Sequence, residues 1–193
     1  QATDPFVKAA KAEGYRSRAA YKLIALAEKY RLFKPGQRVV DLGAAPGGWL
    51  QVAVERVRPG GRVVGIDLSE IAPVTGASLL RGDVEDPKLA PRLRAALGGA
   101  ADLVLSDMAP PTTGHAETDH LRILGLAEAA LALAGEILAP GGGFVVKLRQ
   151  GGGEPEYFQA VKARFTTVMR AKPPASRSES SEIYLVARGF KPD

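Results

Sequence analysis

The chain of 193 residues contains no cysteine, which excludes disulfide bonds and thiolate metal sites and fits a reducing compartment. It also lacks any apolar run near the roughly 20 residues that a membrane-spanning helix requires. The opening stretch QATDPFVKAAKAEG holds no apolar core of the kind found in secretory signals. These absences lead us to expect a cytoplasmic protein with no membrane partner.

Histidine is also scarce. The two histidines, His115 and His120, do not stand at a metal-ligand spacing from nearby carboxylates. We therefore expect no metal site, and we interpret the two as a loop residue and a residue at a helix start.

The charges are unevenly distributed along the chain. Residues 1–38 hold nine lysines and arginines against three acids, residues 39–161 hold ten against fifteen, and residues 162–191 hold seven against two. A single basic cluster is ordinarily a solvated helix face. Two of them in a chain with a pI of about 9.6 indicate a polyanionic partner.

The apolar pattern alternates between strand-like and helix-like segments. Strands are expected at 37–43, 62–68, 77–84, 101–108, 143–150, 165–173 and 180–190, and helices at 16–32, 47–57, 85–97, 118–138 and 154–165. Such alternation is typical of a parallel sheet covered on both faces. The last two strands are joined only by a polar loop, so they should pair antiparallel. We expect one α/β domain over residues 1–193, with a mostly parallel seven-stranded sheet, a C-terminal antiparallel hairpin and a basic N-terminal helical segment over about residues 1–35.

The first expected strand runs into a glycine-rich turn, DLGAAPGG. Ligands of parallel sheets bind beyond the carboxyl ends of the strands, and glycine lets the backbone approach them closely. The dinucleotide fingerprint G-x-G-x-x-G requires glycine where this turn has Ala45, and Pro46 removes an N–H that a pyrophosphate could use. The turn therefore disfavours a nicotinamide dehydrogenase and favours a ligand without phosphates.

Two acids follow the next strands. Asp67 ends the second strand, where it could accept both ribose hydroxyls of an adenosine, and Asp83 follows the third, where it could accept the adenine amino group. Each acid alone is equally well explained as a turn former. Together with the turn they outline an adenosine pocket without a phosphate cradle, and S-adenosylmethionine is the common ligand of that description.

Five blocks of the sequence resemble the RrmJ/FtsJ ribosomal RNA 2′-O-methyltransferases, most closely the bacterial and mitochondrial branch. They are RSRAAYKL (16–23), VVDLGAAPGGW (39–49), SDMAP (106–110), LAPGGGFVVKLRQG (138–151) and SRSESSEIYLVA (176–187). The resemblance implies a Rossmann-like, S-adenosylmethionine-dependent methyltransferase fold. One departure is Pro111, where bacterial members often have asparagine beside the cofactor pocket.

The resemblance also implies the site residues. It implies a catalytic tetrad of Lys22, Asp107, Lys147 and Glu182. It places Gly47, Trp49, Asp67, Asp83 and Asp107 in the cofactor site, to which the glycine turn adds Gly43 and Gly48.

A ribose 2′-hydroxyl must be aligned and deprotonated before it can accept a methyl group, and alignment alone can supply about 7–11 kcal/mol in the best cases. Lys147, the expected general base, follows an apolar strand, although a lysine there can also simply reach out to water. A lysine acts as a base only when neutral, which requires burial or a nearby cation such as Lys22 to lower its pKa. Asp107 is expected to orient Lys147, and Glu182 to pair with Lys22. Without the resemblance, Asp107 would be interpreted as a turn former, Glu182 as an exposed strand residue and Lys22 as a basic surface residue.

The expected RNA contacts lie in the two basic regions. Arg16, Arg18 and Arg31 precede or lie on the helix that carries Lys22, and Arg170, Lys172 and Arg177 lie near the hairpin that carries Glu182. All six are expected to contact RNA phosphates.

Family likeness points to a uridine in the A-loop of large-subunit ribosomal RNA, within the assembled subunit, and to a monomeric enzyme. Three alternatives stay open from the residues: methylation of transfer RNA, methylation of a messenger RNA cap, and an RNA-binding ribosome-assembly factor whose catalysis is dispensable.

Overall fold

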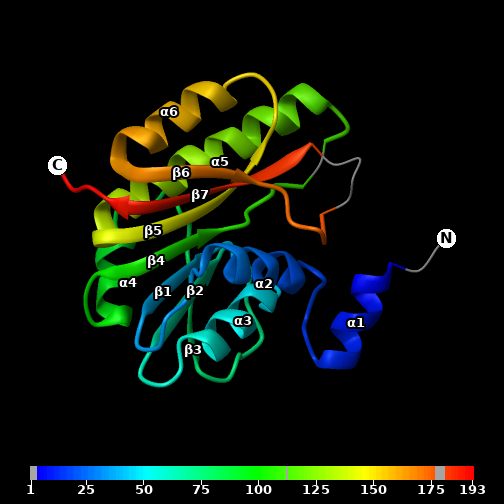
Figure 1. Cartoon of the computed structure of the whole chain (residues 1–193), viewed down its shortest axis with the longest axis vertical. Helices are drawn as coiled ribbons and strands as arrows, with labels where there is room; N and C mark the ends of the chain where they lie inside the picture. The colour runs from blue at the N-terminus through cyan, green and yellow to red at the C-terminus, as the bar shows by residue number, and fades with distance from the viewer. Residues whose placement is uncertain (1–3, 112, 177–180) are drawn as a thin grey trace.

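A seven-stranded sheet lies between two layers of helices in residues 4–111, 113–176 and 181–193, which this computed structural model describes (Figure 1). The strands are β1 (Arg38–Leu42), β2 (Arg62–Asp67), β3 (Ala77–Arg81), β4 (Ala101–Ser106), β5 (Leu138–Arg149), β6 (Phe165–Ala171) and β7 (Glu182–Phe190). The helices are α1 (Pro5–Glu13), α2 (Ala19–Tyr30), α3 (Gly48–Arg56), α4 (Leu89–Leu97), α5 (Ala116–Ile137) and α6 (Glu154–Arg164).

The strand order is β3-β2-β1-β4-β5-β7-β6. The five strands from β3 to β5 are parallel, whereas β7 pairs antiparallel with both β5 and β6. This confirms the predicted mostly parallel sheet with an antiparallel C-terminal hairpin. The order in which strands are added to the sheet reverses between β1 and β4, so the carboxyl ends of these parallel strands flank the switch point where such sheets bind ligands.

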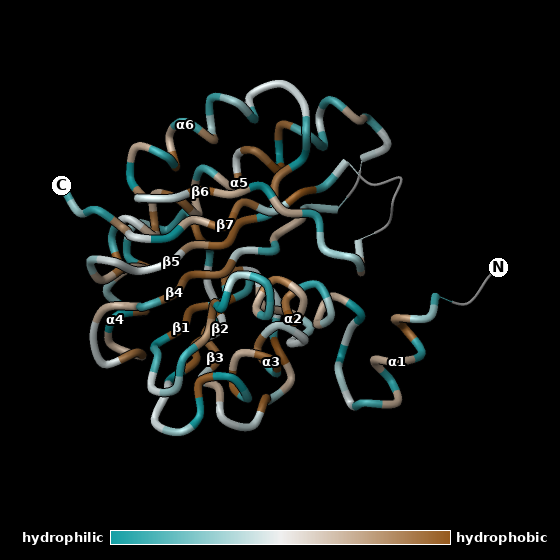
Figure 2. The backbone as a smooth tube through the Cα atoms, viewed as in Figure 1, coloured by the Kyte–Doolittle hydropathy of each residue, from teal (hydrophilic) through white to brown (hydrophobic). Residues whose placement is uncertain are grey.

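Two apolar layers hold the helices to the sheet. One layer joins α4, α5 and α6 to the sheet through residues such as Leu93 and Phe144. The other joins α2 and α3 to the opposite face through residues such as Leu23 and Leu50. The strands are the most hydrophobic part of the tube in Figure 2, as expected for strands buried on both faces. Within the described residues, no helix is long and apolar enough to cross a membrane.

Helix α1 lies within the helical segment expected over about residues 1–35, although the sequence placed a defined helix only at 16–32. It begins at Asp4, whose side chain accepts a 2.8 Å hydrogen bond from the Phe6 amide, and it ends at Gly14 with φ of 83°. These are ordinary N-cap and C-cap signals. The apolar pattern between them is weak, since only Ala10 of this helix is buried, and Figure 1 shows the helix beside α2, set apart from the sheet.

Three elements also begin three or more residues away from the expected start. Helix α2 begins at Ala19 rather than residue 16, because residues 14–18 form a separate connection. Helix α4 begins at Leu89 rather than residue 85, because Asp83 and Asp86 accept backbone hydrogen bonds that hold residues 83–88 in turns. Strand β5 begins at Leu138 rather than residue 143, because Leu138 already pairs with Ala101 of β4. The register then shifts before Gly143 pairs with Leu103.

Candidate active site

Three neighbouring strands bring Asp107, Lys147 and Tyr184 together at one end of the sheet. Ser106 of β4 pairs with Val146 of β5, so Asp107 follows beside Lys147. Lys147 is in turn paired with Tyr184 of β7. The Lys147 Nζ lies 3.4 Å from Oδ1 of Asp107, and the Tyr184 hydroxyl donates a 2.6 Å hydrogen bond to the same oxygen.

Lys147 does not reach out to water, because its side chain is only 8% exposed. A buried amine needs a polar partner, and Asp107 supplies one. Burial, together with the Asp107 charge, raises the pKa of Tyr184 well above its ordinary value. Tyr184 therefore keeps its proton and acts as a donor to Asp107.

Lys22 reaches the same cluster from α2, which packs on the face of the sheet that contains Tyr184. Burial lowers the pKa of Lys22; the charges of Asp107 and Glu182 oppose this shift, and those of Lys147 and Arg18 add to it. Glu182 begins β7 two residues before Tyr184 and so lies on the same face of that strand. The other three predicted catalytic residues, Asp107, Lys147 and Glu182, therefore all lie within electrostatic range of Lys22.

A cleft of about 770 Å³ opens beside this cluster, beyond the carboxyl ends of β1 to β4. Four of the predicted cofactor residues line it: Gly43, Asp67, Asp83 and Asp107. Residues 108–111, including Pro111, also line the cleft, together with Arg122, Gly125 and Leu126 of α5. Sequence reasoning did not assign these α5 residues to the site, because nothing in the helical pattern indicates which turn faces the cleft.

The carboxylates that line the cleft are hydrogen-bond acceptors. Asp67 accepts backbone hydrogen bonds from Ala45 at 3.0 Å and Ser69 at 2.8 Å, and Asp83 accepts one from Glu85 at 2.9 Å. Each carboxylate oxygen has two lone pairs, so both acids can still accept hydroxyl or amino donors. A Cβ at Gly43 would lie 2.3 Å from Cγ of Met108, so glycine is required at this wall. These groups fit the hydroxyl and amino donors of an adenosine.

Gly47, Gly48 and Trp49 are buried, and none of them lines the cleft. A Cβ at Gly48 would lie 2.8 Å from Oγ of Ser17. The Trp49 indole N–H donates a 2.8 Å hydrogen bond to the carbonyl of Ala19. These residues therefore fasten the glycine turn to the start of the helix that carries Lys22.

Asp41, in β1, is an acid for which the sequence predicted no role. It is 1% exposed, and its Oδ2 has no hydrogen-bond partner among the described residues. Burial, followed by the charges of Asp107 and Asp67, raises the pKa of Asp41 well above its ordinary value. An acid inside an otherwise apolar strand was the signal that could have identified it.

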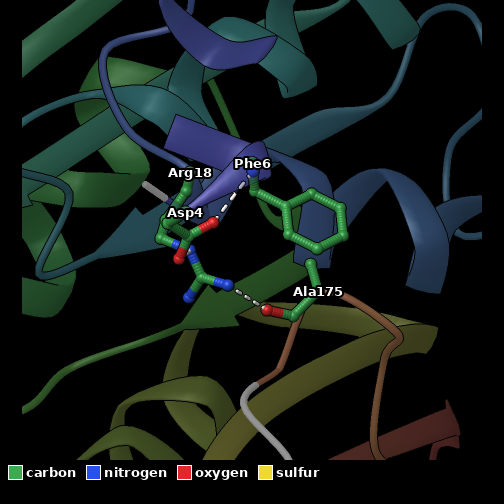
Figure 3. Close-up of polar contacts among 4 residues, drawn as sticks. All are labelled: Asp4, Phe6, Arg18 and Ala175. Atoms are coloured by element: carbon green, nitrogen blue, oxygen red, sulfur yellow. Dashed lines mark hydrogen bonds and ion pairs between the residues drawn. The ribbon is translucent and has the colours of Figure 1, made fainter. Parts of the chain in front are cut away.

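Arg16, Arg18 and Arg170 were all expected to contact RNA, and each is held by other groups of the protein. Arg16 donates to backbone carbonyls around the glycine turn. Arg18 lies 2.8 Å from Asp4, donates to the carbonyl of Ala175 at 2.5 Å and lies over the ring of Phe6 (Figure 3). Arg170 pairs with Glu154 at 2.7 Å and stacks over Phe158. Arg31 and Lys172 are exposed, and Arg177 lies outside the described residues.

The two histidines stand apart from any cluster of ligands. His115 stands at the N-cap position of α5 without a side-chain capping bond, and the ring of His120 contacts the carbonyl of Gly152. In the part of the chain that the structure describes, no three histidines, cysteines or acids are grouped so that they could hold a metal ion.

Comparison with known proteins identifies related sequences over the whole chain. Residues 15–190 match the model of the FtsJ-like methyltransferases. The chain is 58% identical to the Ribosomal RNA large subunit methyltransferase E of Acidiphilium cryptum over 193 residues, which covers 100% of this chain and 85% of that protein. Its identity to the protein of the same name from Paramagnetospirillum magneticum is also 58%, over 99% of this chain and 80% of that protein.

A solved structure gives the same result. The crystal structure of a protein from Plasmodium falciparum, described as a ribosomal RNA methyltransferase, matches with a TM-score of 0.85 and 31% identity. The match covers 93% of this chain and 100% of that one.

Proposed function

Since this chain belongs to the FtsJ-like methyltransferase family, we propose that it uses S-adenosylmethionine to methylate the ribose 2′-hydroxyl of a uridine in large-subunit ribosomal RNA. The proposed target is the A-loop within the assembled large subunit, and the proposed enzyme is a cytoplasmic monomer. The names of the bacterial relatives support the RNA class. The observation that carries the chemistry is the buried contact between Lys147 and Asp107, beside a cleft whose lining includes the carboxylates of Asp67 and Asp83.

The cleft residues would hold the cofactor by its adenosine. Asp67 would accept the ribose hydroxyls and Asp83 the adenine amino group, while the missing side chain at Gly43 keeps the wall open. When bound, S-adenosylmethionine supplies an electrophilic methyl group on a positively charged sulfur. The carboxylate of Asp107 lines the same cleft and offers that charge a partner.

We assign Lys147 as the general base. Its Nζ would take the proton of the 2′-hydroxyl, which leaves the ribose oxygen free to accept the methyl group. Asp107 holds the Lys147 side chain in place from one side, and Tyr184 holds Asp107. Because all three come from adjacent strands of one sheet, the proton acceptor is positioned before the RNA arrives.

Lys22 and Glu182 are assigned to the RNA side of the cluster. Burial lowers the pKa of Lys22, so an incoming ribose or phosphate oxygen would compensate the charge of this side chain. Glu182, whose charge favours the ionised form of Lys22, would orient that side chain. The exposed Arg31 and Lys172 are proposed to contact phosphates, and Arg177 is proposed to do so on its sequence position alone. Arg18 and Arg170 are proposed to support these contacts through the loops that they hold.

Methyl-labelled S-adenosylmethionine tests the proposal. The protein is offered undermethylated large subunits, naked large-subunit RNA and bulk transfer RNA in parallel, and any labelled nucleotide is mapped. A labelled 2′-O-methyluridine in the subunits is the expected result. Label in transfer RNA alone would show that transfer RNA is the substrate instead. If no RNA is labelled while the cofactor still binds, the result would favour a ribosome-assembly factor.

A further inference from the structure

We propose that Arg16 is a positioning residue that holds the two loops of the cofactor cleft at a fixed separation, in place of the RNA contact expected from its charge. The inference rests on the proposed function, because it assumes that the cleft binds S-adenosylmethionine.

Arg16 bridges two loops that follow different strands. Its Nη1 donates to the carbonyl of Pro46 at 3.0 Å and to the carbonyl of Ala72 at 2.6 Å, and its Nη2 donates to the carbonyl of Pro73. Pro46 belongs to the glycine turn after β1, whereas Ala72 and Pro73 belong to the loop after β2. One guanidinium therefore joins the two loops from outside the cleft.

The same two loops form walls of the cleft. Residues 43 and 45 line it from the glycine turn, and residues 67–69 line it from the loop after β2. Inside the cleft, Asp67 joins the loops by accepting the amide of Ala45 at 3.0 Å. Arg16 and Asp67 thus fasten one pair of loops from opposite sides.

The guanidinium packs directly against the turn. A Cβ at Gly47, where φ is 122°, would lie 3.0 Å from the Nη1 of Arg16. The backbone of Arg16 is fixed as well, since its amide donates to Oε1 of Gln51 at 2.9 Å, and Nε2 of Gln51 donates to the carbonyl of Gly14 at 3.0 Å. Gln51 lies on α3, the helix that follows the turn. Both the backbone and the side chain of Arg16 are therefore attached to the cofactor half of the molecule.

Arginine suits this role and lysine does not. A planar guanidinium can donate to three carbonyls on two loops at once, whereas an ammonium on a flexible stem holds them without a fixed geometry. Donors already used in this way are not free for a phosphate. Because Arg16 is exposed to solvent, we expect its loss to weaken cofactor binding by about tenfold, the effect of one or two charge-assisted hydrogen bonds.

Calorimetric titration with S-adenosylmethionine tests the inference on the full chain. We compare the wild type with Arg16→Ala, with Arg16→Lys and with Arg58→Ala, which removes an exposed arginine just after α3. Both Arg16 variants are expected to raise Kd about tenfold at unchanged binding stoichiometry, and Arg58→Ala is expected to bind like the wild type. Steady-state assays should show a raised KM for the cofactor, with kcat and the KM for RNA within twofold of the wild type.

Each other outcome is decisive. A variant that is merely misfolded would lose stoichiometry and kcat at an unchanged Kd, and that result would overturn the inference. Wild-type cofactor affinity in Arg16→Ala together with a raised KM for RNA would show that Arg16 contacts RNA, as expected from its charge. A wild-type protein that binds no S-adenosylmethionine would overturn the proposed function itself, and the inference with it.

Discussion

The hydroxyl of Tyr184 donates a 2.6 Å hydrogen bond to Oδ1 of Asp107. Tyr184 is 1% exposed, and its ring lies 5.8 Å from that of Trp49. The oxygen that accepts this bond is also the one that lies 3.4 Å from Nζ of Lys147. Tyr184 therefore fixes the acid that fixes the proposed base.

Tyr184→Phe keeps the buried ring and removes only the hydroxyl. We expect the rate of methyl transfer at saturating cofactor to fall by about 10- to 100-fold, because a hydrogen bond to a charged group contributes about 1.5–3 kcal/mol. Single-turnover kinetics measure this rate directly. The matched control is Tyr157→Phe, since the Tyr157 hydroxyl donates a 2.7 Å hydrogen bond to the carbonyl of Ala127 on the opposite face of the sheet. A wild-type rate in Tyr184→Phe would show that Asp107 positions Lys147 without the hydrogen bond from Tyr184.

Lys22→Met is expected to inactivate the enzyme while stabilising the fold at neutral pH. Burial lowers the pKa of Lys22 in the folded protein. At any pH below that pKa, the ionised side chain therefore reduces the free energy of unfolding. At pH values between the folded and the unfolded pKa of Lys22, the unfolded chain binds more protons than the folded one, so the free energy of unfolding rises with pH. The destabilisation disappears over this range. Urea midpoints should be higher for Lys22→Met than for the wild type at pH 7, with a gap that closes toward alkaline pH. Lys34→Met, at an exposed lysine, is the control, and a constant gap or a less stable Lys22→Met would contradict the account.

Asp41→Asn is expected to show the opposite dependence on pH. Because the pKa of Asp41 is raised by burial and by neighbouring acids, its contribution to stability is complete below its unfolded pKa and is lost as the pH rises through the folded pKa. Asparagine does not titrate, so the stability of Asp41→Asn relative to the wild type should increase from pH 4 to pH 8. Urea unfolding at several pH values measures this difference, with Asp193→Asn at the exposed C-terminus as the control for one lost charge. A difference that shrinks as the pH rises would show that Asp41 is stabilised as a carboxylate.

Much of the fold could be predicted because local patterns determine it. Strand and helix periods alternate along the chain, and the loop before β7 cannot hold a crossover helix, so parallel strands and an antiparallel hairpin follow. The glycine turn, Asp67 and Asp83 each stand at a strand end, which is enough to place them at the cleft.

Side-chain partners across the fold could not be predicted in this way. Tyr184 looks like one more apolar residue of an alternating strand, and only the register of β7 against β5 brings it to Asp107. Arg16 looks like an RNA contact because its carbonyl partners are separated from it by 30 residues or more. Helix α1 was not placed as a separate helix within the expected helical segment for a different reason, since its capping residues are clear but its apolar face is nearly absent.

The central claim is that Lys147 removes the proton of the 2′-hydroxyl, and Lys147→Arg tests it most directly. Arginine keeps the positive charge beside Asp107, but it stays protonated and cannot act as a base. With cofactor binding checked by calorimetry, single-turnover methylation of undermethylated large subunits should fall by about 100- to 10,000-fold, the contribution of a positioned general base. A rate within tenfold of the wild type, with cofactor and RNA still bound, would show that Lys147 acts through its charge and that another group takes the proton.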